Sequence, residues 1–109
     1  MNILSQLPWT EQKKIAAWQS CRPIQGVSPA DYRIDAHGNL IVWDHHGKQG
    51  EYGWEVDHII ALALGGADSL ANVRALHWRA NRKLGANVGN ALRRADDLNT
   101  RIANALLRR

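Results

Sequence analysis

Residues 53–85 read GWEVDHIIALALGGADSLANVRALHWRANRKLG and contain the main signals for secondary structure and for a functional site. An adjacent acid and imidazole, Asp57 and His58, end a strand-like run. Asn72 follows a glycine-containing connection, and Asn81 lies in a helix-like run. A strand and a helix that pack together would bring these polar side chains to one point. The intervals therefore suit one compact metal site.

The same stretch predicts a strand, a loop, a second strand and a helix. The pair Gly65 and Gly66 interrupts regular structure and indicates that a loop crosses here. Residues 73–76 are typical of a short strand, and residues 77–84 of a helix that Gly85 would close. Residues 87–109 predict a separate amphipathic helix, because apolar residues recur along one face at Val88, Ala91, Leu92, Ala95, Leu98, Ile102, Ala105 and Leu106. This face either packs on the core, the favoured interpretation, or forms a coiled-coil or partner-binding seam of fewer than three heptads.

Upstream, residues 10–20 predict a short amphipathic helix that Thr10 could cap. Prolines and a glycine indicate a loop over residues 22–30. Two successive hairpins are then expected, with turns at Gly38 and Asn39 and at residues 47–50. Their strands are marked by Tyr32, Ile34, Leu40, Val42, Trp54 and Val56. The pattern predicts an α+β fold in one domain over residues 1–109.

Charge and cysteine usage set wider limits. The formal charge of +4 permits a polyanionic partner. Basic residues crowd the expected site at Arg74, Arg79, Arg82 and Lys83 and the C-terminus at Arg93, Arg94, Arg101, Arg108 and Arg109. Cys21 is the single cysteine, so an intramolecular disulfide and a CxxC zinc cluster are excluded. No segment has the length and apolarity of a membrane span, and we expect a soluble, cytoplasmic protein with no membrane partner.

The central motif resembles the signature of the HNH endonuclease family at Asp57, His58, Asn72 and Asn81, with Arg82 and Lys83 similar to the basic residues that often follow. The resemblance covers residues 53–85. Residues 35–54 are similar to the hairpin lead-in of small stand-alone phage and bacterial members. The resemblance implies a ββα-metal core at about 53–85, preceded by a helix and a hairpin and followed by a C-terminal helix at about 87–109.

The resemblance also implies roles for the motif residues. His58 would be the general base that takes a proton from water, and Asp57 and Asn81 would bind one divalent cation. Asn72 would pin the loop and so aim the ring of His58. Carboxylate and amide oxygens favour Mg²⁺, with Mn²⁺ as an alternative. A structural zinc is not expected, because the positions where many members carry a CxxC pair are His77 and Ala80.

For several other residues, the sequence allows two possible roles. Glu55 shares a strand face with Asp57, so it is either an outer contact of the metal site or a surface carboxylate. His77 lies four residues before Asn81 and is either a residue of the site or a helix-start residue. His45 and His46 are exposed turn residues or phosphate contacts. The five tryptophans are expected to build the core in place of Phe, which is absent, rather than to stack on bases.

The resemblance implies a hydrolase that cuts phosphodiester bonds of double-stranded DNA and leaves 5′-phosphate and 3′-hydroxyl ends. One base and one metal suggest a nickase that acts as a monomer. Phosphates would be held by Arg74, Arg79, Arg82 and Lys83. The alternatives are a non-catalytic DNA-binding or interaction module, or a nuclease subunit of a phage or defence complex. A homodimer or larger complex could form through the C-terminal helix.

Overall fold

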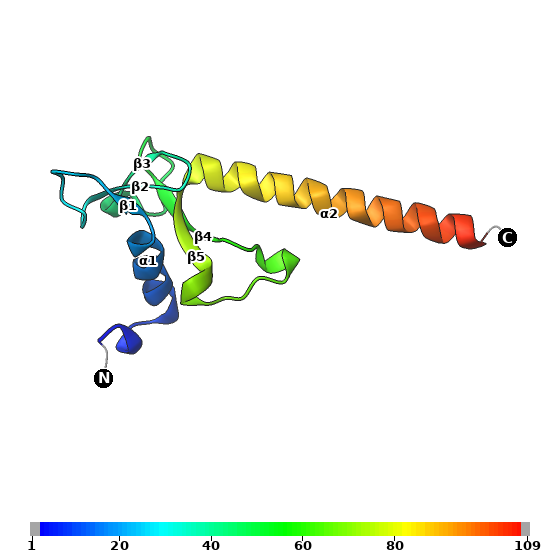
Figure 1. Ribbon diagram of the computed structural model, residues 1–109, viewed down its shortest axis with the longest axis horizontal. Helices are drawn as coiled ribbons and strands as arrows, with labels where there is room; N and C mark the ends of the chain where they lie inside the picture. Colours follow the sequence, from blue (N-terminus) through cyan, green and yellow to red (C-terminus); the bar gives the residue numbers. More distant parts are fainter. Residues whose placement is uncertain (1–2, 108–109) are drawn as a thin grey trace.

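A computed structural model describes residues 3–107, and its elements follow the chain as shown in Figure 1. The helices and strands are α1 (Trp9–Gln19), β1 (Arg22–Pro23), β2 (Tyr32–Ile34), β3 (Leu40–Val42), β4 (Trp54–His58), β5 (Val73–His77) and α2 (Trp78–Leu107). Short 3-10 turns are η1 (Ile3–Gln6), η2 (Trp43–His45), η3 (Leu62–Leu64) and η4 (Leu70–Asn72). The mixture of helix and strand confirms the α+β class. Within the described part of the chain, no helix has both the length and the apolarity needed to cross a membrane.

Two small antiparallel sheets organise the domain. One has the order β1-β2-β3, and the other consists of β4 and β5. In the second sheet Trp54 pairs with His77 and His58 pairs with Val73, so a 14-residue connection joins two fully paired strands. Helix α2 follows β5 directly. The predicted order of strand, loop, strand and helix is therefore confirmed.

The expected second hairpin is wrong, because β3 does not pair with β4. After β3 the chain turns through η2, and its links back to β4 are a single parallel bridge between His46 and Trp54 and side-chain contacts. The indole Nε1 of Trp54 donates to the carbonyl oxygen of Val42 at 2.8 Å. This side-chain bond links β3 to β4 without a strand ladder, and β4 pairs with β5.

A tryptophan cluster forms the centre of the core between α1 and the β4-β5 sheet. The ring of Trp54 is fully buried and lies 5.3 Å from the ring of Trp18 and 5.7 Å from that of Trp43, measured between centroids. Trp9 differs from the expectation, because it is 41% exposed and its indole contacts a loop carboxylate. Trp78 is half-buried at the start of α2. The sequence had assigned all five rings to the core.

Helix α1 begins earlier than expected. Its first residue is Trp9, and Pro8 occupies the N-cap position without a side-chain capping bond. The fixed φ of proline, −53° at Pro8, already suits the entry to a helix. The predicted loop over residues 22–30 contains the two-residue strand β1 at its start, where Arg22 pairs with Ile34. Thr10 therefore lies inside the helix rather than at its cap.

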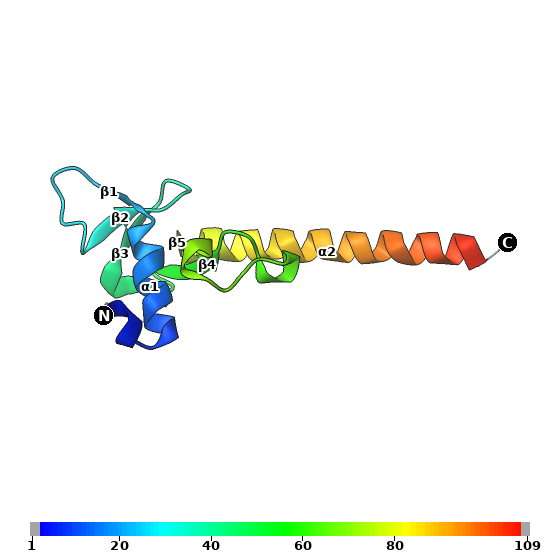
Figure 2. The ribbon, with the colours of Figure 1, turned by 60° about the horizontal axis from the view of Figure 1, so that its bottom comes forward.

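A single helix, α2, replaces the two helices that the sequence predicted on either side of Gly85. A glycine closes a helix when it adopts a positive φ, and Gly85 does not do so. Its cost within a helix is about 1 kcal/mol, which good helix formers around it can offset. The second half of α2 extends away from the domain (Figures 1 and 2). Packing of this segment on the core is therefore wrong, and Leu98, Ile102 and Leu106 are 55%, 50% and 59% exposed.

Asp35 ties the first sheet to the β5–α2 junction and was not singled out by the sequence pattern. Its carboxylate is 4% exposed and accepts the backbone N–H groups of His37, Asn39 and His77 at 3.0, 2.8 and 2.9 Å. Burial raises the pKa of this carboxyl, but the hydrogen bonds outweigh burial and lower it below its usual value. The ionised form is therefore part of the folded structure.

We expect Asp35→Ala to lower the free energy of unfolding by roughly 3 kcal/mol at pH 7, since it leaves buried N–H groups without an acceptor. Because the folded pKa is depressed, this stabilisation is present above the unfolded pKa of about 4 and is lost as the pH falls through the folded value. The difference from the wild type should therefore shrink in acid. Urea denaturation at pH 7 and pH 3 measures both effects. Asp31→Ala at an exposed position is the control, and an equal loss in that variant would contradict the assignment.

Candidate functional site

The end of β4, the connection after it and the first turns of α2 enclose an open groove of about 680 Å³. Asp57, His58 and Asn81 all line this groove. The structure thus places the strand pair and the helical asparagine around one space, although Asn81 follows His58 by 23 residues. Its apolar wall comes from the connection and from α2, at Ile59, Ile60, Leu62, Leu64, Leu84 and Val88.

Asp57 is half-buried and pairs with an arginine from the neighbouring strand. Its Oδ2 accepts a hydrogen bond from Nε of Arg74 at 3.0 Å. The two residues lie directly opposite each other in the β4-β5 register. Arg74 was expected among the DNA-contacting residues, and the structure places it in the groove beside Asp57. The carboxylate could bind a cation through its oxygens.

His58 makes a contact that the sequence analysis missed. Its Nε2 lies 2.8 Å from Oδ1 of Asp68 in the connection. Asp68 also accepts from Nε1 of Trp9 at 2.9 Å and from Nζ of Lys13 at 3.2 Å. The hydrogen bond with His58, followed by those with Trp9 and Lys13, holds the pKa of Asp68 far below its usual value. This carboxylate therefore stays ionised beside the ring.

Asn72 fastens the connection between the strands. Its Oδ1 accepts the backbone N–H of Ile60 at 2.9 Å, and its Nδ2 donates to the carbonyl oxygens of Ile60 and Ala67 at 3.0 and 2.7 Å. The backbone carbonyl of Asn72 also accepts the N–H of Ile59 at 2.9 Å. One side chain thus joins the segment directly after His58 to the far end of the loop. The polar atoms of the Asn72 side chain bind backbone groups, and Asn72 is not among the residues that line the groove.

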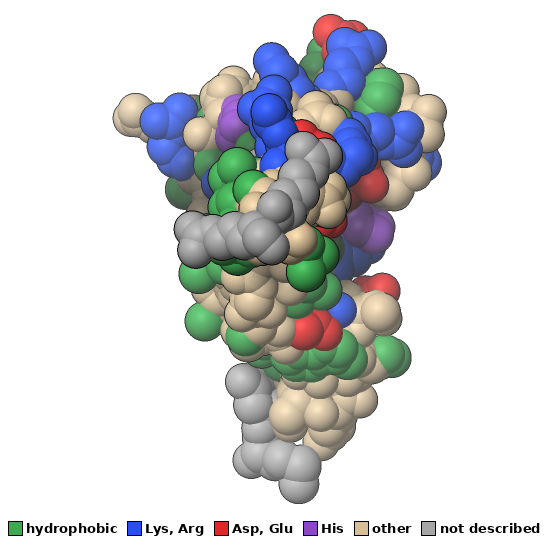
Figure 3. Space-filling model, turned by 90° about the vertical axis from the view of Figure 1, so that its right-hand side faces the viewer, with side chains coloured by type: hydrophobic (Ala, Val, Ile, Leu, Met, Phe, Trp, Pro, Cys, Tyr) green, Lys and Arg blue, Asp and Glu red, His purple; other side chains and the backbone are tan. Residues whose placement is uncertain are grey.

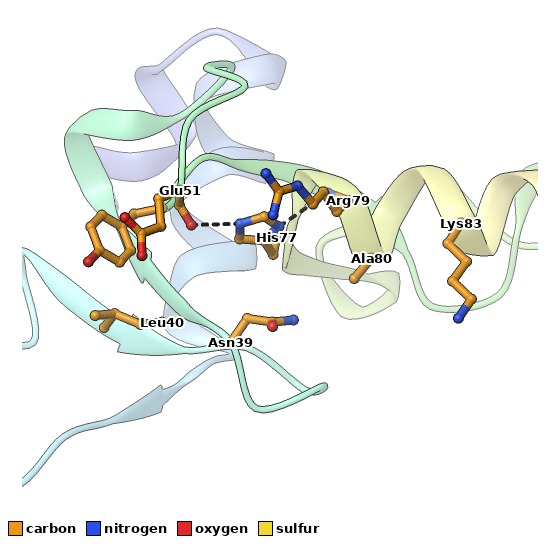
Figure 4. Close-up of a pocket in the computed structure, with 8 residues that line it drawn as sticks. Asn39, Leu40, Glu51, His77, Arg79, Ala80 and Lys83 are labelled. Carbon is orange, nitrogen blue, oxygen red and sulfur yellow. Dashed lines mark hydrogen bonds between the residues drawn. The ribbon is translucent and has the colours of Figure 1, made fainter.

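His77 lies in a different pocket, shown in Figure 4. Its Nε2 donates to the carbonyl oxygen of Glu51 at 2.8 Å, and its Nδ1 accepts the backbone N–H of Arg79 at 3.2 Å. Both ring nitrogens therefore bind the protein, and the second contact caps the start of α2. This geometry matches the helix-start interpretation of His77. The imidazole has no ring nitrogen left for a metal while these contacts persist.

Glu55 and Asp57 differ in their surroundings, although they share a strand face. Oε1 of Glu55 lies 3.7 Å from Nε of Arg82, and no hydrogen bond to this buried oxygen is present among the described residues. The contact is a loose ion pair between β4 and α2. The expected alternatives for Glu55 were an outer contact of the metal site and a surface carboxylate, and the structure adds this link to α2.

Basic side chains lie on the first turns of α2, where Arg79 and Lys83 line the pocket that holds His77 rather than the groove. Arg79, Arg82 and Lys83 are exposed, and the guanidinium groups of Arg79 and Arg82 lie 5.1 and 5.2 Å from the ring centroid of Trp78. Figure 3, which looks from the C-terminal side of α2, shows Lys and Arg side chains gathered toward the top of that face. Such a cluster is suited to phosphate groups of a nucleic acid backbone.

The donor set in the groove decides which metals it could hold. Asp57 offers carboxylate oxygens and Asn81 an amide oxygen, which are hard ligands of the kind that Mg²⁺ binds. Within residues 3–107, no cluster of three or more His, Cys, Asp or Glu side chains is arranged to hold a metal ion. Water and substrate oxygens would have to complete the coordination, as is usual for Mg²⁺. Cys21 is buried and its thiol contacts the carbonyl oxygen of Ala75, away from the groove.

Comparison with protein families gives a match that agrees with this geometry. Residues 43–87 match the family model described as HNH endonuclease. The matched segment contains β4, β5, the first turns of α2 and the groove residues Asp57, His58 and Asn81. The chain therefore carries an HNH endonuclease domain, and the resemblance noted in the motif is confirmed.

This match to part of the chain suggests a nuclease of the HNH family. Nucleases of this family act on DNA and generally use a divalent metal. Searches of curated proteins and of solved structures found no match to the chain.

Proposed function

We propose that this protein is a metal-dependent DNA endonuclease that nicks one strand as a monomer. The observation that carries the proposal is the single groove lined by Asp57, His58 and Asn81, which combines oxygen ligands with an imidazole. One such site offers one base and one cation position, so it serves one phosphodiester bond at a time. Hydrolysis would leave a 5′-phosphate and a 3′-hydroxyl.

Asp57 and Asn81 would hold Mg²⁺, or Mn²⁺ in its place. Bound there, the cation would stabilise the negative charge that develops on the leaving 3′ oxygen. Arg74 would fix the orientation of Asp57 through the 3.0 Å hydrogen bond. Because the protein supplies two ligands, the remaining positions would be open to water and to the phosphate of the substrate.

His58 would act as the general base. Its neutral ring would take a proton from water while the water oxygen bonds to phosphorus and the bond between phosphorus and the 3′ oxygen breaks. The 3′ oxygen would then take a proton from solvent. Asn72 would support this step by holding the backbone directly after His58 through its bonds to Ile60 and Ala67. Arg79, Arg82 and Lys83 would place the DNA by binding phosphates next to the groove.

Metal binding can be tested without DNA by titrating Mn²⁺ into the protein and following its electron paramagnetic resonance signal. We expect one site per chain, and we expect Asp57→Ala and Asn81→Ala each to weaken it at least tenfold, since each removes one of two protein ligands. Glu51→Ala is the matched control, because this exposed carboxylate lies outside the groove. Unchanged Mn²⁺ affinity in both groove variants would contradict the assignment of the ligands.

The exposed apolar face of α2 favours a second candidate. Leu98, Ile102 and Leu106 are at least half exposed on a helix that projects from the domain, as Figure 2 shows. In this candidate the nuclease works as a homodimer or as a subunit of a phage or defence complex, with α2 contacting the partner. Light scattering of the purified protein distinguishes a monomer from a homodimer.

A further inference from the structure

We propose that Asp68 is a positioning residue for the general base: its carboxylate holds His58 in the tautomer that carries the proton on Nε2 and leaves Nδ1 to receive the proton of water. The inference rests on the proposed function, since it assigns the chemistry of the same imidazole. It adds a residue outside the HNH signature, from the connection between β4 and β5.

The tautomer follows from the hydrogen bond. An ionised carboxylate can accept hydrogen bonds but cannot donate them. At 2.8 Å between Oδ1 of Asp68 and Nε2 of His58, the shared hydrogen must therefore belong to the ring. A neutral imidazole carries one N–H, so its other nitrogen, Nδ1, holds the free lone pair. That nitrogen is the one able to accept a proton.

Asp68 is itself held in place by contacts on both carboxylate oxygens. Oδ2 accepts from Nε1 of Trp9 at 2.9 Å, and Nζ of Lys13 lies 3.2 Å from Oδ1 and 3.3 Å from Oδ2. The residue before Asp68 is anchored as well, because the carbonyl oxygen of Ala67 accepts from Asn72. Contacts from α1 and from its own loop thus fix the orientation of the Asp68 carboxylate toward His58.

This arrangement gives helix α1 a connection to the site. Trp9 and Lys13 lie in α1, before the segment that matches the family model. Trp9 is 41% exposed, and its indole donates a hydrogen bond to Asp68. The N-terminal helix therefore packs on the sheet with its buried residues and supports the base with two polar contacts.

The proton would move as follows. The water oxygen bonds to phosphorus while the bond between phosphorus and the 3′ oxygen breaks, and the proton of the water passes to Nδ1 of His58, which converts the ring to an imidazolium. The proton on Nε2 stays on the ring, and the negative charge of Asp68 stabilises the positive charge that forms. The imidazolium then returns its proton to solvent. No proton is transferred to Asp68 in this sequence.

Nuclear magnetic resonance tests the tautomer directly and needs neither DNA nor metal. In protein labelled with ¹⁵N on histidine, at a pH where the ring is neutral, we expect His58 to show a protonated Nε2 and an unprotonated Nδ1. In Asp68→Ala the two nitrogens should move toward the averaged shifts of a mixture of tautomers. A wild-type ring protonated on Nδ1, or a ring whose shifts do not change in Asp68→Ala, would overturn the proposal.

Kinetics of plasmid nicking give the second test. We expect Asp68→Ala and Asp68→Asn to lower kcat about 10- to 100-fold, as for other groups that orient a functional histidine, without raising the KM for DNA. Asp68→Glu should recover part of the lost kcat. Trp9→Phe removes the indole donor to Asp68 but keeps the contact between Asp68 and His58, so its kcat should fall less. Asp44→Asn is the control, at an exposed carboxylate in η2.

The outcomes separate the two proposals. If Asp68→Ala and Asp68→Asn both cleave DNA with the wild-type kcat, Asp68 does not position His58, and the proposed nuclease activity stands. A wild-type protein that never cleaves would count against the proposed function, and the ¹⁵N measurement would still decide the tautomer. If Asp44→Asn loses as much kcat as the two Asp68 variants, the loss is not specific to Asp68 and the inference is wrong.

Discussion

His58→Ala should lower the rate of plasmid nicking by about 10²- to 10⁴-fold while the protein remains folded. Among the described residues that line the groove, the imidazole of His58 is the group suited to take a proton from water, because Asp57 is committed to Arg74 and to the cation. Its ring is half-buried at the end of β4, so its removal leaves the tryptophan core untouched. Steady-state rates with Mg²⁺ in excess measure the effect.

The matched control for this variant is His37→Ala. His37 is exposed in the turn between β2 and β3 and lines a different pocket, so its removal should leave the nicking rate unchanged. Cleavage by His58→Ala at the wild-type rate would remove His58 as the base. Binding of DNA by both variants with wild-type affinity would show that the loss lies in the chemical step.

Trp54→Ala should lower the free energy of unfolding by about 3–5 kcal/mol. The ring is fully buried, contacts the rings of Trp18 and Trp43, and donates its Nε1 hydrogen to Val42. Its loss would leave a cavity between α1 and the β4-β5 sheet and an acceptor without its indole donor. A domain of this size has little stability to spare, so the variant should be largely unfolded.

Urea denaturation followed by circular dichroism measures this change, and Leu98→Ala on the exposed face of α2 is the control. A surface substitution of this kind should change the free energy by about 0.5 kcal/mol or less. A loss for Trp54→Ala no larger than that of Leu98→Ala would contradict the placement of the core.

The motif carried most of the information about the fold around the groove. The apolar run before Asp57, the two glycines of the connection and the helical run around Asn81 are local signals, and local signals define elements. Once the strands pair and the helix follows, the spacing brings Asp57, His58 and Asn81 together. These residues could therefore be grouped from the sequence.

Contacts that depend on packing could not be predicted. Asp68 is one carboxylate in a largely apolar connection, and its link to His58 exists because α1 places Trp9 and Lys13 beside it. In the sequence, Arg74 is one basic residue among several near the motif. Its pairing with Asp57 follows from the register of β4 and β5. No periodicity in the sequence encodes either contact.

Gly85 shows how a local signal can mislead. Glycine after a helical run is typical of a helix end, but the residues on both sides continue the helix and the cost of one glycine is small. Helix α2 therefore runs on to Leu107, and its second half leaves the domain. The apolar pattern of that half correctly indicated a helix and wrongly indicated its contact with the core.

Cleavage of supercoiled plasmid by the wild-type protein shows whether it is a metal-dependent nuclease that nicks DNA. With Mg²⁺ present, we predict that open-circular DNA accumulates before linear DNA, that EDTA stops the reaction and that added Mg²⁺ restores it. DNA that is bound but never cut in the presence of Mg²⁺ or Mn²⁺, or cleavage that continues in EDTA, would contradict the account.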